Sequence, residues 1–375
     1  MKKSHKSKIK PIVFYLPQFH PIAENDGWWG KGFTEWTNVK KAKALFRGHY
    51  QPQIPTDMGY YDLRDPEIKE RQSQLAISYG VYGFCYYHYW SDSNRLLERP
   101  VDDILASGKP AFPFCLCWAN ENWTRRWDGH DQDVLWPIIY SDQDDVRHMQ
   151  WLCNVFKDPR YIKINNKPIF LVYRTCNLPD PARTAKRWRE VACDSGIEEI
   201  LLCNVESLDA CRLDPADIGF DLSIEFQPIW DDLPKSFYGR SSKVYSKMND
   251  FLKQFNLNEL FYFRNRVINY VDYVKLQMKR ESFAYPKIPC VFPSWDNSPR
   301  KGKSDSIVFI NSDPELFGKW VDNTITNYSF KDDQGDKYFF VNAWNEWAES
   351  CYLEPCKKWG YRRLQAIKRF SHHKA

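Results

Sequence analysis

The chain has 375 residues, of which 43% are hydrophobic and 27% are charged, as expected for a soluble globular protein with a full hydrophobic core. A formal net charge of +5, spread along the sequence, is too small to indicate a nucleic-acid-binding protein. No stretch approaches the roughly 18 uninterrupted apolar residues of a membrane-spanning helix.

Eight apolar, β-rich runs occur along the chain. Most of them are continuous rather than alternating, which is typical of parallel strands covered on both faces. The runs are Ile12–Leu16, Val81–Tyr87, Phe112–Trp118, Pro168–Tyr173, Ile200–Val205, Leu222–Phe226, Pro289–Phe292 and Tyr338–Val341.

Helix-like segments separate several of these runs. Two of them begin with Asp-Pro-Glu, at Asp65 and Asp313, which supplies a helix cap, a proline in the first turn and an acid beside it. The repeated strand–helix alternation predicts an α/β fold, a (β/α)8 TIM-type barrel. The helix-like segments are Pro66–Tyr79, Asp144–Phe156, Ala182–Asp194 and Pro314–Tyr328.

The stretch 230–280 is too long for one barrel connection. Ser246–Phe255 and Leu260–Arg280 both look helical, so we expect a helical insertion after the sixth strand. No flexible linker, low-complexity tract or internal repeat divides the chain, and residues 1–375 are therefore expected to form a single domain.

The cysteines and the amino-terminal segment indicate a cytoplasmic protein. Five of the eleven Cys lie inside expected strands, where they would be reduced core thiols: Cys85, Cys115, Cys117, Cys203 and Cys290. The basic start is followed by a short β-type run that turns polar, which does not match a secretory signal.

Both termini are basic, and two interpretations stay open: solvated tails with a solvent-facing helix, or peripheral attraction to an anionic inner-membrane surface. The basic residues are Lys2, Lys3, Lys6, Lys8, Lys10, Lys357, Lys358, Arg362, Arg363, Lys368 and Arg369.

Aromatic residues make up 17% of the chain, including 16 Trp, which is more than a core requires. Many stand beside polar residues where the expected strands end, and this placement favours flat binding surfaces on which the C–H faces of sugars lie well. Polar and aromatic residues follow all eight runs at their C-terminal ends. Barrel enzymes build their active sites at this end.

Glu346 and Glu349 are the candidate catalytic residues. They lie within Trp344–Glu349, directly after the last expected strand. Burial and a neighbouring carboxylate both raise a carboxyl pKa, so one group can stay protonated near pH 7 while the other is ionised. Glycosidic-bond chemistry needs such a donor and acceptor together. The alternative is a structural ion pair with one of the available arginines: Arg125, Arg126 or Arg174.

Further side chains near the strand ends are candidate substrate-binding residues. Aromatic rings would stack on sugar faces, and polar side chains would bind hydroxyl groups, although packing in the barrel mouth is an alternative role. Those near the first four strands are Tyr15, Gln18, His20, Trp36, Tyr87, His88, Trp118, Asn120, Glu121, Trp123, Arg125 and Tyr173. Those near the last four are Glu225, Trp295, Asp296, Asn345 and Trp347.

No metal or cofactor is expected. The chain has no H-x-x-x-H or paired C-x-x-C motif and no Gly-rich phosphate loop. Asp131-x-Asp133 and Asp142-x-Asp144 superficially match the acidic pair of many metal-dependent sugar-nucleotide transferases. Both lie in polar loop or helix-start sequence, and we interpret them as solvated.

Taken together, these motifs resemble those of the WbsX-type carbohydrate enzymes, which are similar to glycoside hydrolase family 99. The resemblance covers nearly the whole chain and implies a (β/α)8 barrel like that of the family-99 endo-α-mannosidases and endomannanases. It rests on the segments Phe14–Pro21, Trp28–Trp36, Gly83–Trp90, Phe114–Trp127, Trp344–Glu349 and Tyr352–Pro355.

The resemblance also implies roles for the two acids. Glu346 would take the proton of the sugar 2-hydroxyl, which forms a 1,2-anhydro sugar, and Glu349 would protonate the leaving oxygen and later deprotonate the acceptor. Ala348 departs from the hydrolases, in which a bulkier polar residue usually separates the acids. WbsX-type members are commonly assigned as glycosyltransferases of bacterial O-antigen, lipopolysaccharide or capsule assembly, so an oligosaccharide or polysaccharide substrate is expected.

Three alternatives stay open. An endo-acting α-mannosidase-like hydrolase differs from a transferase only in whether water or a sugar hydroxyl attacks. A catalytically silent barrel would bind glycans as a scaffold. A metal-dependent nucleotide-sugar transferase would need a diphosphate site. The sequence does not define the sugar, the linkage, the acceptor or the oligomeric state.

Overall fold

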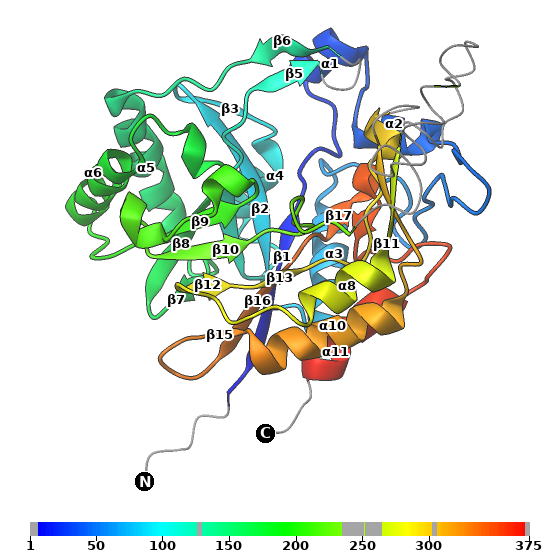
Figure 1. Ribbon diagram of the computed structural model, residues 1–375. Coiled ribbons are helices and arrows are strands. Elements are labelled where there is room, and N and C mark those ends of the chain that lie inside the picture. Colours follow the sequence, from blue (N-terminus) through cyan, green and yellow to red (C-terminus); the bar gives the residue numbers. More distant parts are fainter. Residues whose placement is uncertain (1–6, 126–129, 235–250, 252–264, 302–305, 372–375) are drawn as a thin grey trace.

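The computed structural model describes residues 7–371 except 126–129, 235–250, 252–264 and 302–305. A parallel sheet at the centre curls into a barrel with helices around it (Figure 1). Its order is β12-β10-β9-β8-β4-β2-β1-β16-β13, and adjacent strands in this order are parallel. The strands are β1 (Ile9–Tyr15), β2 (Gly83–Ser91), β4 (Phe114–Trp118), β8 (Lys167–Val172), β9 (Leu201–Glu206), β10 (Leu222–Glu225), β12 (Lys287–Ile288), β13 (Cys290–Val291) and β16 (Lys337–Val341).

The seventh barrel strand joins the two ends of this order, because Pro289 divides it into β12 and β13. Ile288 pairs with Ile224 of β10, and Cys290 pairs with Phe340 of β16. Proline has no N–H for the ladder, so the strand changes partners at this residue. The oxygen of Pro289 still accepts a bond of 2.7 Å from the Phe340 N–H. The eight predicted runs coincide with these strands, and the predicted barrel fold is confirmed.

The four predicted helices are present with nearly the predicted bounds. Asp65 and Asp313 cap two of them, since their side chains accept from the backbone N–H of Glu67 and Glu315 at 2.9 and 3.3 Å. These helices are α3 (Pro66–Ser78), α5 (Asp142–Phe156), α6 (Pro181–Asp194) and α10 (Pro314–Asn327).

Other elements decorate the barrel. The connection from β9 to β10 departs from the alternation, since it contains the 3-10 turns Asp209–Cys211 and Pro215–Ile218 and no α-helix. Further helices in the described part of the chain are α1 (Ala23–Trp29), α2 (Glu35–Lys41), α4 (Arg99–Ser107), α9 (Ser298–Lys301) and α11 (Arg362–Ser371), in addition to one that follows the sixth strand. The short strands are β3 (Asn94–Leu96), β5 (Trp123–Arg125), β6 (His130–Trp136), β7 (Lys163–Ile164), β15 (Phe330–Lys331), β17 (Asn345–Glu346) and β18 (Cys351–Tyr352).

The helical prediction for the stretch after the sixth strand is only partly correct. Most of Ser246–Phe255 lies outside the described residues. The described part of Leu260–Arg280 begins with strand β11 (Arg266–Asn269), which pairs in parallel with β14 (Ile307–Ile310). Helix α8 (Tyr270–Gln277) then follows. The β-branched residues of β11 are buried against neighbours, an environment that favours a strand over a helix.

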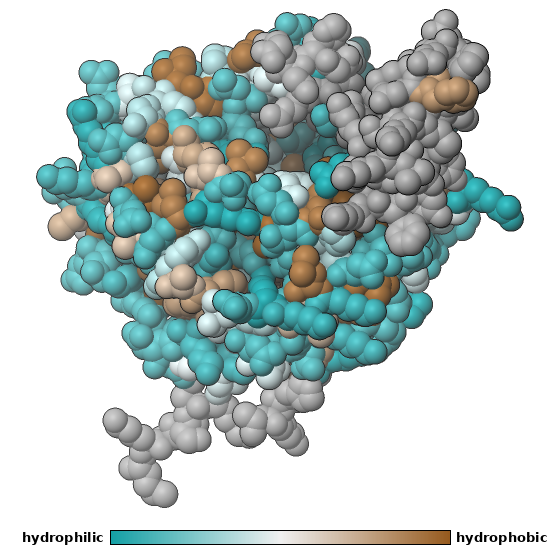
Figure 2. Space-filling model, viewed as in Figure 1, coloured by the Kyte–Doolittle hydropathy of each residue, from teal (hydrophilic) through white to brown (hydrophobic). Residues whose placement is uncertain are grey.

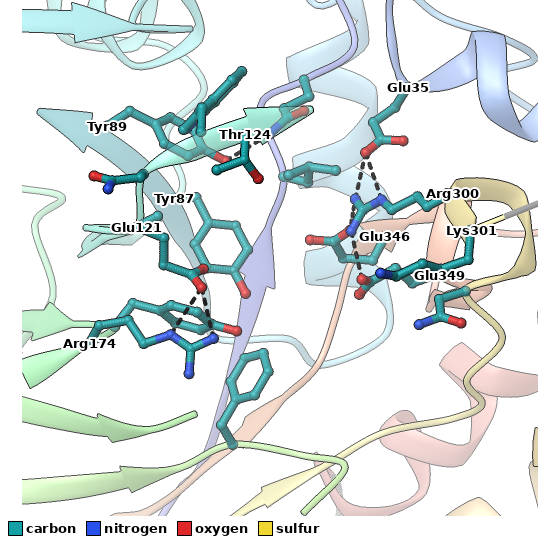
Figure 3. Close-up of a pocket in the computed structure, with 18 of the residues that line it drawn as sticks. Glu35, Tyr87, Tyr89, Glu121, Thr124, Arg174, Arg300, Lys301, Glu346 and Glu349 are labelled. Carbon is teal, nitrogen blue, oxygen red and sulfur yellow. Dashed lines mark hydrogen bonds and ion pairs between the residues drawn. The ribbon is translucent and has the colours of Figure 1, made fainter. Parts of the chain in front are cut away.

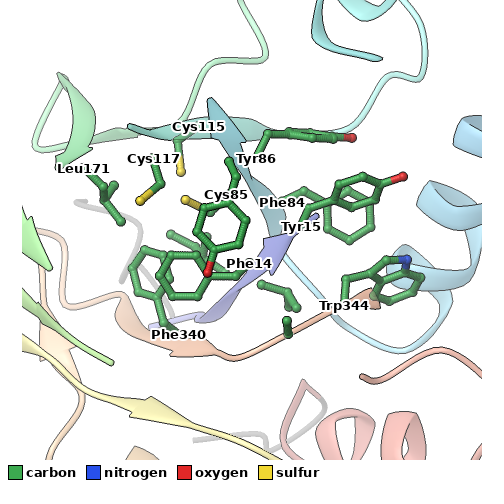
Figure 4. Packing of buried hydrophobic residues seen from close by; sticks show 14 of the residues in the cluster. Phe14, Tyr15, Phe84, Cys85, Tyr86, Cys115, Cys117, Leu171, Phe340 and Trp344 are labelled. Carbon is green, nitrogen blue, oxygen red and sulfur yellow. The ribbon is translucent and has the colours of Figure 1, made fainter. Parts of the chain in front are cut away.

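Side chains of the barrel strands alternate between the interior and the surrounding helices (Figure 4). Phe14 lies inside, where its ring is 5.1 Å from Phe340, while Tyr15 lies outside, where its ring is 5.1 Å from Phe84. The five strand cysteines are buried and unpaired, as predicted. The alternation continues to the strand ends and decides which side chains reach the barrel mouth.

Hydrophobic residues on the face shown in Figure 2 form small separate groups among hydrophilic ones. Within the described residues, no helix has both the length and the apolar character needed to cross a membrane.

Candidate active site

A cavity of about 590 Å³ opens at the C-terminal end of the barrel strands, as predicted for a barrel enzyme (Figure 3). Its charged lining residues are Glu35, Glu121, Arg174, Arg300, Lys301, Glu346 and Glu349. Its aromatic lining residues are Trp29, Tyr87, Tyr89, Trp123, Tyr173, Phe226, Trp230 and Trp295. The remaining lining residues are Leu16, Gln18, Ala119, Asn122, Thr124 and Asn297.

Three carboxylates meet on one guanidinium at one wall of this cavity (Figure 3). Arg300 donates from Nη2 to Glu346 Oε2 at 2.8 Å and from Nη1 to Glu349 Oε1 at 2.6 Å. Its Nε donates to Glu35 Oε1 at 3.0 Å. Arg300 occupies only one carboxyl oxygen of Glu346 and one of Glu349, and both residues line the cavity. Within the described part of the chain, no other group bonds to the second oxygen of either acid, so this oxygen is available to a ligand.

The electrostatics of this cluster favour a retained proton. Burial raises the pKa of Glu346 to about 8 and also raises the pKa of Glu349. The charge of Glu35 raises both values further, whereas Arg300 opposes the increase. One guanidinium carries one positive charge, so three ionised carboxylates would leave buried negative charge uncompensated. The direction of both pKa changes is the one expected from the sequence.

Neighbouring contacts fix the loop that carries the two acids. The Asn345 side chain accepts from the Leu16 N–H at 2.8 Å and donates to the Leu16 oxygen at 3.0 Å, which joins the loop to the end of β1. Trp347 lies between the acids in sequence, and its ring stacks on Tyr352 with centroids 3.8 Å apart. Its Nε1 donates to the buried Glu354 at 2.6 Å.

A second charged pair occupies the opposite side of Tyr87 (Figure 3). Arg174 donates from Nε and Nη2 to Glu121 Oε1, at 3.0 and 2.8 Å. The rings of Tyr87 and Tyr173 stand perpendicular, with centroids 5.9 Å apart. The two walls together offer aromatic faces, hydroxyl-binding groups and a proton donor and acceptor within one cavity.

Some of the predicted site residues line the cavity, and others do not. The predicted residues that line it are Gln18, Tyr87, Glu121, Trp123, Tyr173, Trp295, Glu346 and Glu349. The other predicted substrate-binding residues do not line it: Tyr15, His20, Trp36, His88, Trp118, Asn120, Arg125, Glu225, Asp296, Asn345 and Trp347.

Several of these residues face away from the cavity because strand side chains alternate. His88 lies between Tyr87 and Tyr89 on β2 and points outward, where its Nε2 is 3.0 Å from Nε2 of His148. Trp118 also lies outside and donates from Nε1 to a backbone oxygen of β2 at 3.0 Å. Tyr15 donates to the Gln72 side chain at 2.7 Å. These side chains therefore pack in the barrel wall and do not reach a substrate in the cavity.

Other predicted residues fasten the loops of the barrel mouth. Asn120 Oδ1 accepts from the backbone N–H of Arg174 at 2.8 Å. Trp36 Nε1 donates to the Tyr61 backbone oxygen at 2.7 Å. Asp296 Oδ2 lies 2.7 Å from His49 Nε2.

The last three residues of this group also lie outside the cavity. Glu225 is paired with Arg280 and accepts from the Cys290 N–H at 2.9 Å. The Arg125 guanidinium lies 5.7 Å from the centroid of the Trp29 ring. His20 is buried, which lowers its pKa to about 4.

Neither Glu35 nor Arg300 is among the site residues predicted from the sequence. Glu35 lies in Trp28–Trp36, one of the segments that carry the family resemblance, but no pattern in this segment predicts a contact with the acid pair. Arg300 was also absent from the arginines considered as ion-pair partners of Glu346 and Glu349. Its position in α9, shortly after the seventh strand, was the one available signal.

Within the described residues, no group of three or more His, Cys, Asp or Glu is arranged to hold a metal ion. The interpretation of Asp144 as solvated is wrong. It is buried and accepts from Trp90 Nε1 at 3.0 Å and from the Ser93 N–H at 2.9 Å. Its role is to cap a loop next to β2.

Comparison with known families gives a match over most of the chain. The family model described as Glycosyltransferase WbsX matches residues 11–367. Two relatives, both named uncharacterized protein WxcX, come from two strains of Xanthomonas campestris pv. campestris. Each is 40% identical over 357 residues, which cover 95% of this chain and 49% of the relative. The chain thus spans about half the length of these relatives.

Solved structures with low sequence identity share the fold. A GH99 endo-alpha-mannosidase from Bacteroides thetaiotaomicron, in complex with bis-tris propane, has a TM-score of 0.53 at 15% identity, covering 96% of this chain and 95% of that one. A glycoside hydrolase-like protein has a TM-score of 0.55 at 12% identity, covering 99% and 96%.

Proposed function

The chain belongs to the WbsX glycosyltransferase family of carbohydrate-active enzymes, and we propose that it makes or breaks a glycosidic bond with Glu346 and Glu349 as its acid and base. The observation that carries this proposal is the pair of carboxyls at one cavity wall, Glu346 buried and Glu349 half-buried, each with one oxygen free of Arg300. Aromatic rings on the facing wall suit the C–H faces of a sugar.

The proposed reaction has two balanced steps. In the first, ionised Glu346 takes the proton of the sugar 2-hydroxyl, O2 bonds to C1, the bond from C1 to the leaving oxygen breaks, and protonated Glu349 gives its proton to that oxygen. In the second, Glu349 takes a proton from the acceptor hydroxyl, the acceptor oxygen bonds to C1, the C1–O2 bond breaks, and Glu346 returns its proton to O2. Because both pKa values are raised, the pair retains one proton, and the reactive form is the one in which this proton lies on Glu349 while Glu346 is ionised.

The substrate we propose is an oligosaccharide or polysaccharide of bacterial surface assembly, such as O-antigen, lipopolysaccharide or capsule. Transfer to a sugar hydroxyl in the cytoplasm is the first candidate, without a bound cofactor. Peripheral attraction of the basic termini to the inner membrane belongs to this proposal, and sedimentation with anionic vesicles tests it. An endo-acting α-mannosidase-like hydrolase is the second candidate, since the cavity and acid pair would serve water as the acceptor equally well.

Mass spectrometry of a glycan library incubated with the protein tests the proposal. Wild-type protein should form a new product, and Glu346→Gln and Glu349→Gln should each abolish it, whereas Glu315→Gln on the surface should not. Full turnover by both active-site variants would remove the assignment. Tight glycan binding that survives both changes, with no product from any variant, would favour a silent scaffold.

The metal-dependent nucleotide-sugar alternative has its own test. Calorimetry with several nucleotide sugars in the presence of manganese should detect no binding. A clear binding isotherm would instead establish a diphosphate site and displace the acid–base proposal.

A further inference from the structure

Glu35 lies on a helix that is packed against the loop of the acid pair. It is the first residue of α2, whose cap Thr34 forms a reciprocal capping box, and a carboxylate at this end of a helix is favoured by the helix dipole. The next residue, Trp36, packs on Trp347 with ring centroids 5.5 Å apart. Helix α2 is therefore fixed against the loop that carries the acids.

Arg300 approaches from the other side and is also fixed. The side chain of Asp296 accepts from the Ser298 N–H at 2.9 Å at the start of α9. The backbone N–H of the same Asp296 donates to the backbone oxygen of Glu349 at 2.7 Å. The short helix that carries the guanidinium is thus tied to the backbone of a residue that the guanidinium contacts.

Stability alone does not explain the position of Glu35. Its side chain is fully buried, and among the described residues its Oε2 has no hydrogen-bond partner. A buried acceptor without a partner destabilises the folded protein, and a buried ion pair is often no more stabilising than apolar residues of the same volume. What this arrangement does achieve is a fixed guanidinium, held by Glu35 through both Nε and Nη2.

We propose that Glu35 and Arg300 are positioning residues of the acid pair: Glu35 holds the guanidinium, and the guanidinium orients Glu346 and Glu349 so that one oxygen of each faces the substrate. This inference rests on the proposed function and adds two residues to it. Neither Glu35 nor Arg300 exchanges a proton with the sugar.

The charges of the two positioning residues act in opposite directions on the acid pair. The charged groups that face the pair are Arg300 and Lys301 from α9, Glu35 from α2 and Glu121 from the loop after β4. Glu35→Gln removes a negative charge, so the pKa of both acids should fall. Arg300→Gln removes a positive charge, so both should rise. A role limited to packing would not move them in opposite directions.

The primary experiment is an NMR titration of the intact protein labelled with ¹³C at the Glu carboxyls. Signals of Glu346 and Glu349 are assigned from their Gln variants, and midpoints are compared in wild type, Glu35→Gln and Arg300→Gln. The matched control Glu315→Gln removes a carboxylate from a surface ion pair with Arg369 and should leave the midpoints unchanged. Midpoints that stay fixed, or that move in the same direction in both variants, would overturn the inference.

Activity supplies the second measurement. Arg300→Lys keeps the charge but loses the planar fork, so kcat should fall about 100-fold while KM changes little, because the error lies in orientation. Unchanged kcat in Arg300→Lys would refute the positioning role.

If the midpoints move as expected but Glu346→Gln keeps full turnover, the proposed function fails while the electrostatic coupling stands. If Arg300→Gln does not fold, Arg300→Lys replaces it in the titration. Because the lysine keeps the positive charge, its midpoints should stay near those of wild type, whereas Glu35→Gln should still lower them.

Discussion

Glu354 should make the folded protein less stable as the pH rises from about 4.5 to about 7. Its buried carboxyl accepts from Tyr61, Gln72 and Trp347 at 3.0, 2.7 and 2.6 Å. Burial outweighs these bonds and raises its pKa from 4.5 to about 7. Between these pH values the folded protein keeps a proton that the unfolded chain has released, so the free energy of unfolding falls. A difference of about 2.5 pKa units corresponds to about 3 kcal/mol.

Urea unfolding of wild type and Glu354→Gln, followed by Trp fluorescence across this pH range, measures the effect. The variant lacks the carboxyl, so the unfolding free energy of wild type minus that of the variant should fall by about 3 kcal/mol. The amide adds a constant cost, because its NH2 group must face a donor. Glu281→Gln, at an exposed position, is the control and should follow wild type. A wild type that gains stability relative to Glu354→Gln would show that the three donated bonds outweigh burial.

Three further predictions concern the candidate site and the side chains that support it. Trp347→Ala removes a fully buried ring stacked on Tyr352 and should destabilise the protein by about 3–5 kcal/mol. Urea unfolding measures this loss, and a value below about 1 kcal/mol would contradict the supporting role of the ring. Arg174→Met should raise KM about tenfold with little change in kcat, because it removes hydroxyl-binding donors remote from the acid pair; steady-state kinetics on an identified glycan decides this. Removal of divalent metals with EDTA should leave product formation unchanged, and restoration of a lost activity by manganese would argue for metal chemistry.

The barrel was predictable because its signal is local. A short continuous apolar run such as that of β16 is typical of a strand covered on both faces, and Asp-Pro-Glu at Asp65 marks a helix start without tertiary information. The strand β11 was missed for the opposite reason. Its sequence fits an amphipathic helix, and only pairing with β14, a tertiary contact, selects the extended form.

The sequence predicts less well which side chains at the strand ends point into the cavity. Tyr87 and His88 are neighbours in one polar and aromatic run, yet only Tyr87 lines the cavity. Alternation predicts that one of the two points inward but not which one, since that depends on the register of the closed barrel. The contact of Arg300 with Glu35 joins residues 265 positions apart, and no local pattern announces it.

An arginine bound to both candidate acids is at first sight an argument against catalysis, because ion pairing lowers carboxyl pKa values and occupies oxygens. Two features of the structure reverse that conclusion. Glu35 also forms an ion pair with Arg300, so the single positive charge of the guanidinium cannot neutralise Glu346 and Glu349 together. Burial keeps the pKa of both acids raised. The contacts also leave one oxygen of each acid free of Arg300 beside a cavity of about 590 Å³. A structural ion pair would be expected to satisfy both carboxylates and to exclude solvent, whereas this one orients two acids toward open space.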